Sequence, residues 1–233
     1  STVRKLLDIP FEGKTYPDRI LVMGTPFEFP SLFSDLSLVN YVSDPGNYAH
    51  ILRIPDLWRI SLPLTDATPD SVALSDDYIL GRLRALMPQI GTPEIPVRGV
   101  YTAHQRVAAR YRQGRVFLAG DAAHVNNPVG GMGMNSGLQD GLNLADKLTQ
   151  ILLHGADATA LLDRYDRQRR LTAIEYVQAQ SIANKKTLEE KDPAVRQTNL
   201  DNLRRMANDK AKALDFVRRA SLVAMLEKAE SIQ

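Results

Sequence analysis

The sequence predicts an α+β fold in which a mixed or antiparallel sheet comes first and helices follow. Residues 19–64 form short runs of β-branched and aromatic residues separated by turn residues. Residues 116–120 are a compact apolar run that ends in glycine, and from residue 136 apolar residues recur with helical spacing. We therefore divide the chain into a sheet region, a strand–loop–helix unit and a helical segment, over residues 1–112, 113–155 and 156–233.

The composition excludes several kinds of chemistry. The 233 residues include no cysteine, which rules out disulfides, thiolate zinc sites, iron–sulfur clusters and a cysteine nucleophile. The four histidines show neither the HExxH pattern nor any other close pairing, so no metal site is expected. A typical share of apolar and charged residues predicts a folded globular protein.

The charge pattern predicts no polyanionic or membrane partner. There are 29 basic and 27 acidic residues, and no apolar run approaches the roughly 20 residues that span a bilayer. The first residues lack the basic start and apolar stretch of a signal peptide. We therefore expect a cytoplasmic protein that binds neither nucleic acid nor membrane.

Four runs in the first region predict a strand meander. A hairpin-like break at 43–47 separates the second run from the third, and a tight turn at 54–56 separates the third from the fourth. The runs are so apolar at alternate positions that one face of the sheet should cover a core or a ligand. The runs themselves are 19–24, 36–42, 47–54 and 57–64.

Helix signals follow the meander. Ser75 begins a capped amphipathic stretch that stops at Pro88, which predicts a short helix. Residues 93–112 are irregular to strand-like, and residues 116–120 have the character of a buried strand. Near the C-terminus, Pro193 ends one helix and starts another.

Residues 115–148 are the most informative stretch. Asp121 follows the predicted strand, and a glycine-rich loop leads into a helix that should begin near 134–136. The N–H groups of residues 133–135 would then lack helical partners and favour an electron-rich oxygen. The loop matches neither the phosphate-binding GxxxxGK[ST] pattern nor a GxGxxG that follows its strand at once. The residues alone leave open whether it binds a ligand or only packs tightly against a sheet.

The same stretch resembles the GD motif, the second flavin-binding motif of the FAD-dependent aromatic hydroxylases. These are class A flavoprotein monooxygenases typified by 4-hydroxybenzoate hydroxylase. The resemblance rests on Gly120, Asp121, Ala122, Ala123, His124, Pro128, Gly130, Gly133, Asn135, Asp140, Asn143, Leu144 and Lys147. It implies that the fold is part of an FAD- and NAD(P)-binding, Rossmann-like fold.

The resemblance assigns roles to the loop. It implies that Asp121 binds the ribityl hydroxyls of FAD and that Pro128 lines the flavin and the substrate. It also implies that the amides of residues 133–135 face the pyrimidine end of the flavin, which agrees with the electron-rich oxygen expected above. The expected cofactor-binding residues are Gly120, Asp121, Pro128, Gly130, Gly131, Met132, Gly133, Met134 and Asn135.

The resemblance also implies a partner segment. The family begins with a GxGxxG unit and a middle Asp-Gly motif, and neither occurs here. Residues 1–4 resemble those just after that Asp-Gly, and Arg4 would align with an arginine near the pyridine-nucleotide path. The chain thus resembles the C-terminal portion of a longer enzyme, and we expect an N-terminal FAD-binding segment to complete the flavin site.

The implied reaction is the hydroxylation of a phenol-like aromatic compound. The family reduces FAD with NADH or NADPH, and O2 then forms a flavin hydroperoxide that transfers one oxygen atom to the ring. The sheet is the expected substrate wall, with Tyr41, Trp58 and Arg59 beside Pro128 as candidates. Strand alternation puts Trp58 and Arg59 on opposite faces. His50 is either a base for the phenolic proton or a packing residue.

Two alternatives remain. The chain by itself is a non-catalytic or incomplete fragment that binds flavin or a small molecule, or it keeps the flavin and catalyses another reaction, as related reductases and halogenases do. The loop sequence GGMGMN is more similar to the phenol hydroxylases.

Overall fold

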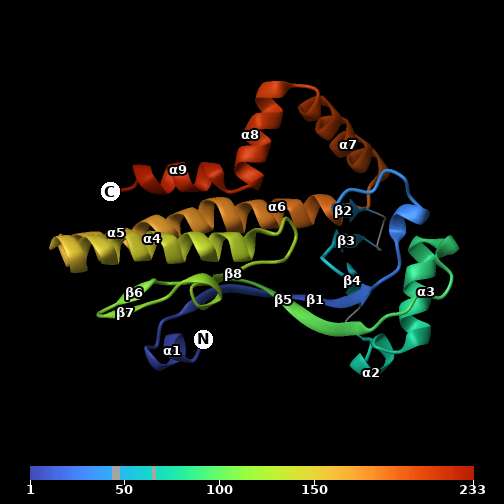
Figure 1. Cartoon of the computed structure of the whole chain (residues 1–233), viewed down its shortest axis with the longest axis horizontal. Coiled ribbons are helices and arrows are strands. Elements are labelled where there is room, and N and C mark those ends of the chain that lie inside the picture. Colours follow the sequence, from blue (N-terminus) through green and yellow to red (C-terminus); the bar gives the residue numbers. More distant parts are fainter. Residues whose placement is uncertain (44–47, 65–66) are drawn as a thin grey trace. The chain divides into compact units, whose positions relative to one another are not determined.

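The computed structural model describes residues 1–43, 48–64 and 67–233 (Figure 1). Its contacts divide the chain into two compact units. The sheet unit comprises residues 16–103 and 188–192, and the helical unit comprises residues 1–15, 104–187 and 193–233. The units interleave along the chain because the two long strands, β1 (Phe11–Thr25) and β5 (Val97–Ala108), belong partly to each.

The sheet unit contains the predicted meander. Its strands are β2 (Val39–Val42), β3 (Ala49–Arg53) and β4 (Trp58–Leu64), and the hydrogen-bonded order is β2-β3-β4-β1-β5. The pairs β2–β3, β3–β4 and β4–β1 are antiparallel, which confirms the predicted antiparallel sheet. The turn at 54–56 is also confirmed, because Ile54 and Leu57 exchange backbone hydrogen bonds of 2.8 and 3.3 Å. The predicted break at 43–47 lies largely outside the described residues.

One face of this sheet builds a core. Its residues alternate with those of the other face, as strand geometry requires. Helix α3 (Asp76–Leu86) covers this face with Ile79 and Leu83. Ser75 caps α3 by accepting from the amide of Tyr78, and the helix ends two residues before Pro88, as predicted. The inward-facing side chains include Leu21, Met23, Ala49, Ile51, Trp58, Ile60 and Leu62, packed with Phe29 of η1 (Phe29–Ser31).

The remaining short elements of the sheet unit frame α3. Helix α2 (Asp70–Ala73) precedes it and η2 (Pro88–Ile90) follows it. Both contribute buried residues, Ala73 and Ile90 respectively.

The helical unit is built on two long helices that pack on each other, α4 (Met132–His154) and α5 (Ala158–Thr172) (Figure 1). Gly155 ends α4 with φ +68°, and the Asp157 carboxylate caps α5 by accepting from two backbone amides. A π-helical turn, η4 (Ala173–Gln178), joins α5 directly to α6 (Ala179–Leu188). The chain continues through α7 (Pro193–Ala207), α8 (Lys210–Ala220) and α9 (Val223–Ser231).

The shorter elements of the helical unit are α1 (Thr2–Leu6), β6 (Arg112–Gln113), β7 (Val116–Phe117), η3 (Gly120–Ala122) and β8 (His124–Val125). Strand β8 pairs antiparallel with β5 at Arg106 and Val107. No helix in the described part of the chain is both long enough and apolar enough to cross a membrane.

The prediction of a buried strand over residues 116–120 is wrong. Strand β7 has two half-buried residues and pairs only with β6, across a turn at Gly114. The Leu118 amide donates to the Tyr111 carbonyl, and Gly120 has φ +57°, which extended backbone does not allow. The segment therefore leaves the strand conformation before Asp121.

Truncating the core of the sheet unit should destabilise it. Leu83 is fully buried, so we expect Leu83→Ala to lower the free energy of unfolding by about 2–5 kcal/mol. The matched control is Leu38→Ala at a residue that is 70% exposed, which should change it by less than about 0.5 kcal/mol. Urea unfolding followed by the fluorescence of Trp58 measures both, and equal effects would contradict this core.

Candidate functional site

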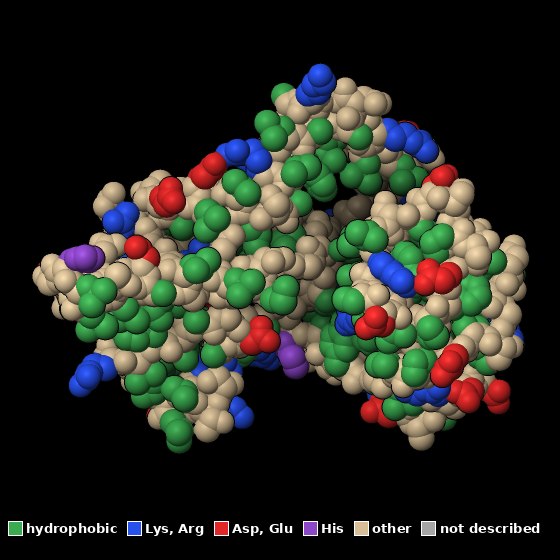
Figure 2. Space-filling model, viewed as in Figure 1, with side chains coloured by type: hydrophobic (Ala, Val, Ile, Leu, Met, Phe, Trp, Pro, Cys, Tyr) green, Lys and Arg blue, Asp and Glu red, His purple; other side chains and the backbone are tan. Residues whose placement is uncertain are grey.

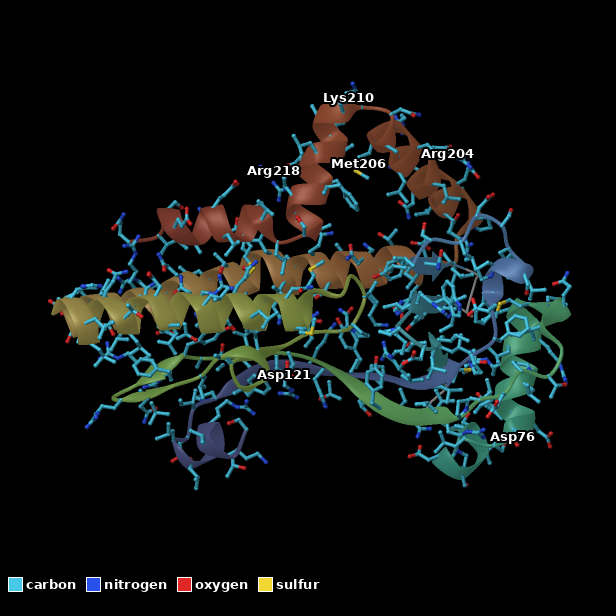
Figure 3. The ribbon with its side chains drawn as sticks, viewed as in Figure 1. Asp76, Asp121, Arg204, Met206, Lys210 and Arg218 are labelled. Carbon is cyan, nitrogen blue, oxygen red and sulfur yellow. The ribbon has the colours of Figure 1, made fainter. Side chains whose placement is uncertain are left out.

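The turn after β7 and the start of α4 lie against each other in the helical unit. Gly120 and Gly137 make the contact, and a Cβ atom on Gly137 would lie 3.0 Å from the Gly120 Cα. Only a glycine allows this approach without a shift of the backbone. Asp121, labelled in Figure 3, therefore lies on a turn that is seated on α4, and its own side chain is exposed.

Helix α4 begins without a side-chain cap. It starts at Met132, two residues earlier than predicted, and Gly131 takes the capping position with φ +63°. A helix that starts here leaves the amides of Met132, Gly133 and Met134 without helical partners. The Asn135 amide falls one position later, within reach of the Gly131 carbonyl, which also accepts from the Asn135 side chain at 3.1 Å. The helix N-terminus thus presents free donors and the positive end of its dipole.

Gly130, Gly131 and Gly133 at the start of α4 form what we call the glycine cradle, and at Gly130 and Gly133 a side chain of the protein itself lies where a Cβ atom would point. Gly130 has φ +104°, and a Cβ there would meet Asn184 at 2.6 Å. A Cβ on Gly133 would lie 3.0 Å from the Asn126 side-chain oxygen. Gly131 and Asn135 are exposed, while the Met132 side chain is buried among Val177 and Met225. Met132 can therefore contribute its amide but not its side chain.

The Asp140 carboxylate fixes the turn that carries Asp121. It is completely buried, and its Oδ2 atom accepts from the Gly120 amide at 3.0 Å and from His124 Nε2 at 2.8 Å. Its Oδ1 atom accepts from Arg169 Nε at 2.7 Å. Gly120 and His124 flank Asp121 in the sequence, and Arg169 reaches the Asp140 carboxylate from α5. Asp140 had no predicted role, although its position four residues after the buried Ser136 places an acid on the buried face of α4.

Aromatic rings close off this carboxylate. The Tyr111 ring stacks on His124, with centroids 6.1 Å apart, and the Tyr165 hydroxyl donates to the Leu118 carbonyl at 2.6 Å. Burial, and then the nearby charge of Asp140, raise the pKa of Tyr111 and of Tyr165 above the usual value. Both phenols therefore stay protonated well beyond neutral pH.

Arg4 supports the same turn. Its guanidinium donates to the Ala122 carbonyl at 2.7 Å and lies 3.6 Å from the centroid of the Phe11 ring. Arg4 is buried, so its contacts within the described residues are structural ones on the turn next to Asp121.

Two further motif residues pack α4 on α5. Lys147 Nζ donates at 2.8 Å both to Asn143 on its own helix and to Gln168 of α5. Burial, followed by the charge of Arg164, lowers the pKa of Lys147. These residues stabilise the helix pair and lie along α4 beyond the glycine cradle.

In the sheet unit, the predicted substrate residues divide between the two faces. Tyr41 pairs with His50, and His50 pairs with Ser61, so these side chains share the face opposite the core. Arg59 lies on that face too and bonds the Tyr101 hydroxyl. Trp58 points the other way, into the core, with its ring 5.6 Å from that of Phe29.

His50 is surrounded by aromatic rings. The Tyr41 ring meets it edge-on at 5.0 Å between centroids, and the Tyr48 ring lies 5.7 Å away. His50 is buried, whereas Tyr41 is exposed. Burial raises the pKa of Tyr101, and the Arg59 guanidinium opposes this rise. This face therefore offers a histidine, phenols and the Arg59 guanidinium.

The sequence matches a known family model. Residues 1–180 match the model described as "FAD binding domain". The chain is 32% identical over 226 residues to para-nitrophenol 4-monooxygenase of Pseudomonas sp. strain WBC-3, covering 93% of this chain and 54% of that protein. It is 30% identical over 220 residues to 6-hydroxy-3-succinoylpyridine 3-monooxygenase HspB of Pseudomonas putida, covering 92% and 54%.

The fold is similar to that of a solved structure. The crystal structure of p-nitrophenol 4-monooxygenase PnpA from Pseudomonas putida DLL-E4 aligns with a TM-score of 0.86 and 30% identity. The alignment covers 95% of this chain and 57% of that one. The chain thus spans about half the length of the relatives it matches.

Removing the charge of Asp140 should destabilise the helical unit. Asp140→Asn leaves the Arg169 guanidinium buried without its counter-charge, so we expect a loss of about 3–5 kcal/mol in the free energy of unfolding. The control Asp146→Asn makes the same change at an exposed position of α4, where the effect should stay below about 0.5 kcal/mol. Urea unfolding followed by circular dichroism decides, and a loss below 1 kcal/mol for Asp140→Asn would refute the central role of this carboxylate.

Proposed function

The chain belongs to the family of FAD-binding domains found in the flavoprotein aromatic hydroxylases, and on this premise we propose that it cradles FAD in a monooxygenase that hydroxylates a phenol-like compound. The observation that carries the proposal is the uncapped N-terminus of α4 behind two left-handed glycines, beside the exposed Asp121. The amide donors at the start of α4 fit a flat, electron-rich ring, and the carboxylate acceptor of Asp121 fits a chain of hydroxyls.

Each part of the loop has a role in this proposal. The amides of Met132, Gly133 and Met134 stabilise negative charge on the pyrimidine oxygen of the flavin. The Asp121 carboxylate accepts hydrogen bonds from the ribityl hydroxyls. Pro128, half-buried between two buried residues, lines the flavin and the substrate. Gly131 lets the ring approach the backbone, because no atom of the described residues lies within 4 Å of where its Cβ would be.

Bound FAD would supply the redox and oxygen chemistry, with NADH or NADPH as the electron donor and O2 as the co-substrate. The monooxygenase names of the relatives support this reaction class. The chain's own part is to hold the cofactor, orient the aromatic ring and exclude water.

For the substrate, we propose the face of the sheet that carries Tyr41, His50 and Arg59. His50 takes the phenolic proton, because an imidazole nitrogen can accept a proton and two aromatic rings shield this one from water. Arg59 supplies a cation toward the phenolate or an acidic ring substituent. Trp58 supports this wall from the core side.

The surface of α4 supports a partner segment. Met134, Leu138 and Leu142 recur at four-residue spacing, and each is at least 60% exposed. Figure 2 shows hydrophobic side chains at the surface in the region of α4. Rows of exposed apolar residues mark interfaces. Since the matched relatives are nearly twice as long, we propose that an N-terminal FAD-binding segment of the same enzyme covers this row.

The same exposed row favours a second candidate. The 233-residue chain by itself would then be an incomplete module that binds flavin or a small molecule without turnover. Oxygen uptake that yields hydroxylated product separates the hydroxylase from this module and from a reductase or halogenase.

The Asp121 carboxylate should be needed for FAD binding. We expect Asp121→Ala to weaken FAD about 10- to 100-fold, the effect of losing a charge-assisted hydrogen bond. Asp146→Ala, at an exposed position of α4, is the control and should bind as the wild type does. The measurement is a titration followed by flavin fluorescence, with the chain alone and with the N-terminal portion supplied in trans. Well-folded wild type that binds no FAD under either condition would refute the proposed function.

His50 should affect the pH profile of turnover. We expect His50→Gln to lower kcat/KM for 4-nitrophenol about 100-fold and to change the pH dependence of the rate, because the variant lacks the proposed base. His104→Gln is the control, because His104 is exposed and bonds only Thr15 at 3.0 Å among the contacts of the described residues. Steady-state assays from pH 5 to 9 on the full-length gene product test this. An unchanged profile would leave His50 as a packing residue.

A further inference from the structure

A π-helical turn interrupts the long helix behind the loop. Helices α5 and α6 are continuous through η4, where the hydrogen bonds step to the fifth residue. The extra residue in this turn rotates every later side chain relative to a regular helix. Gln178, at the end of η4, thereby points into the buried interior of the helical unit.

Gln178 bonds both β8 and β5. Its Nε2 donates to the Val125 carbonyl at 3.0 Å, and its Oε1 accepts from Gln105 Nε2 at 2.5 Å. Gln105 Nε2 also donates to Ser181 Oγ at 3.0 Å, one turn further along α6. The π turn and the first turn of α6 therefore hold one buried side chain of β5 in a fixed orientation.

Gln105 in turn accepts hydrogen bonds from the loop that carries Pro128. Its Oε1 accepts from the Asn127 backbone amide at 3.0 Å and from the Asn127 side chain at 2.9 Å. The Asn127 Oδ1 atom in turn accepts from the Val129 amide at 3.1 Å. These contacts lie on both sides of Pro128, so the backbone that carries Pro128 is held by neutral amide groups.

This hydrogen-bond network destabilises the folded protein if any of its buried amide groups lacks a partner. Gln105, Asn127 and Gln178 are each at most 9% exposed, and a buried amide that loses its partner keeps its full desolvation penalty. Pro128 has no amide proton of its own to bond. The position of this loop is thus determined by side chains from β5 and η4.

We propose that Gln178, aligned by the π turn, and Gln105 are positioning residues that set the place of residues 127–131 and with it the flavin contacts of Pro128 and the glycine cradle. This inference rests on the proposed function. It adds that the helix behind the loop, through its irregular turn, determines how well the loop receives the flavin.

The test uses volume-conserving variants. Gln105→Met and Gln178→Met remove the amide contacts without leaving a cavity. Gln197→Met is the matched control, because Gln197 is exposed on α7 and bonds Asp201 of its own helix at 3.0 Å. All are made in the full-length gene product.

Two readouts are needed. In the flavin-free protein, hydrogen exchange at the Asn127 and Val129 amides should become at least 10-fold faster in both variants and stay unchanged in the control. Flavin fluorescence should then show FAD bound at least 10-fold more weakly by the same variants, with exchange in the middle of α4 unchanged.

Each result is decisive. Unchanged exchange at Asn127 and Val129, or faster exchange with unaltered FAD affinity, would overturn the positioning role and leave the proposed function intact. Wild-type protein that binds no FAD would overturn both. Faster exchange together with weaker FAD binding, absent from Gln197→Met, supports the proposal.

Discussion

The buried Asp140 carboxylate is the interaction on which the rest of the site depends. A carboxylate removed from water is unstable unless opposite charge and hydrogen bonds surround it. Here the Arg169 guanidinium supplies the charge, and Gly120 and His124 supply further donors. These groups come from α5 and from both ends of the turn that carries Asp121. Losing any one of them would leave the carboxylate undersatisfied, so α4, α5 and the turn are fixed together.

The two halves of the loop are held by different chemistry. A charged cluster anchors the turn at Asp121, whereas neutral amides of Gln105 and Gln178 anchor the segment around Pro128. The Asp140 charge is balanced by Arg169, so it adds little net field at the start of α4. The N-terminus of α4 therefore keeps its attraction for an electron-rich ligand group.

Local signals in the sequence were sufficient for much of the fold. Ser75 and Pro88 bound α3, and strand alternation places Trp58 and Arg59 on opposite faces. What the sequence did not reveal depends on contacts between distant residues. Asp140 meets Arg169 across 29 positions, and Gln105 meets Gln178 across 73. Helical periodicity could not place Gln178 either, because a π turn departs from the 3.6-residue repeat.

The local errors have physical causes too. The strand at 116–120 was overestimated because an apolar run ending in glycine is also compatible with a short hairpin strand and a left-handed turn. The start of α4 was placed late because Gly131 carries none of the side chains that mark a cap. Both errors fall on the proposed flavin loop, where glycines replace the residues that usually mark element ends.

The conformation of Gly131 explains why α4 has no capping side chain. With φ +63°, position 131 lacks the extended backbone from which a serine or aspartate side chain caps a helix. Glycine costs the helix only a few tenths of a kcal/mol by comparison and leaves the amides of Met132, Gly133 and Met134 for a ligand. Its positive φ also turns the incoming chain away from the helix axis. The flavin that we propose for this site would therefore meet these amides without competition from a capping side chain.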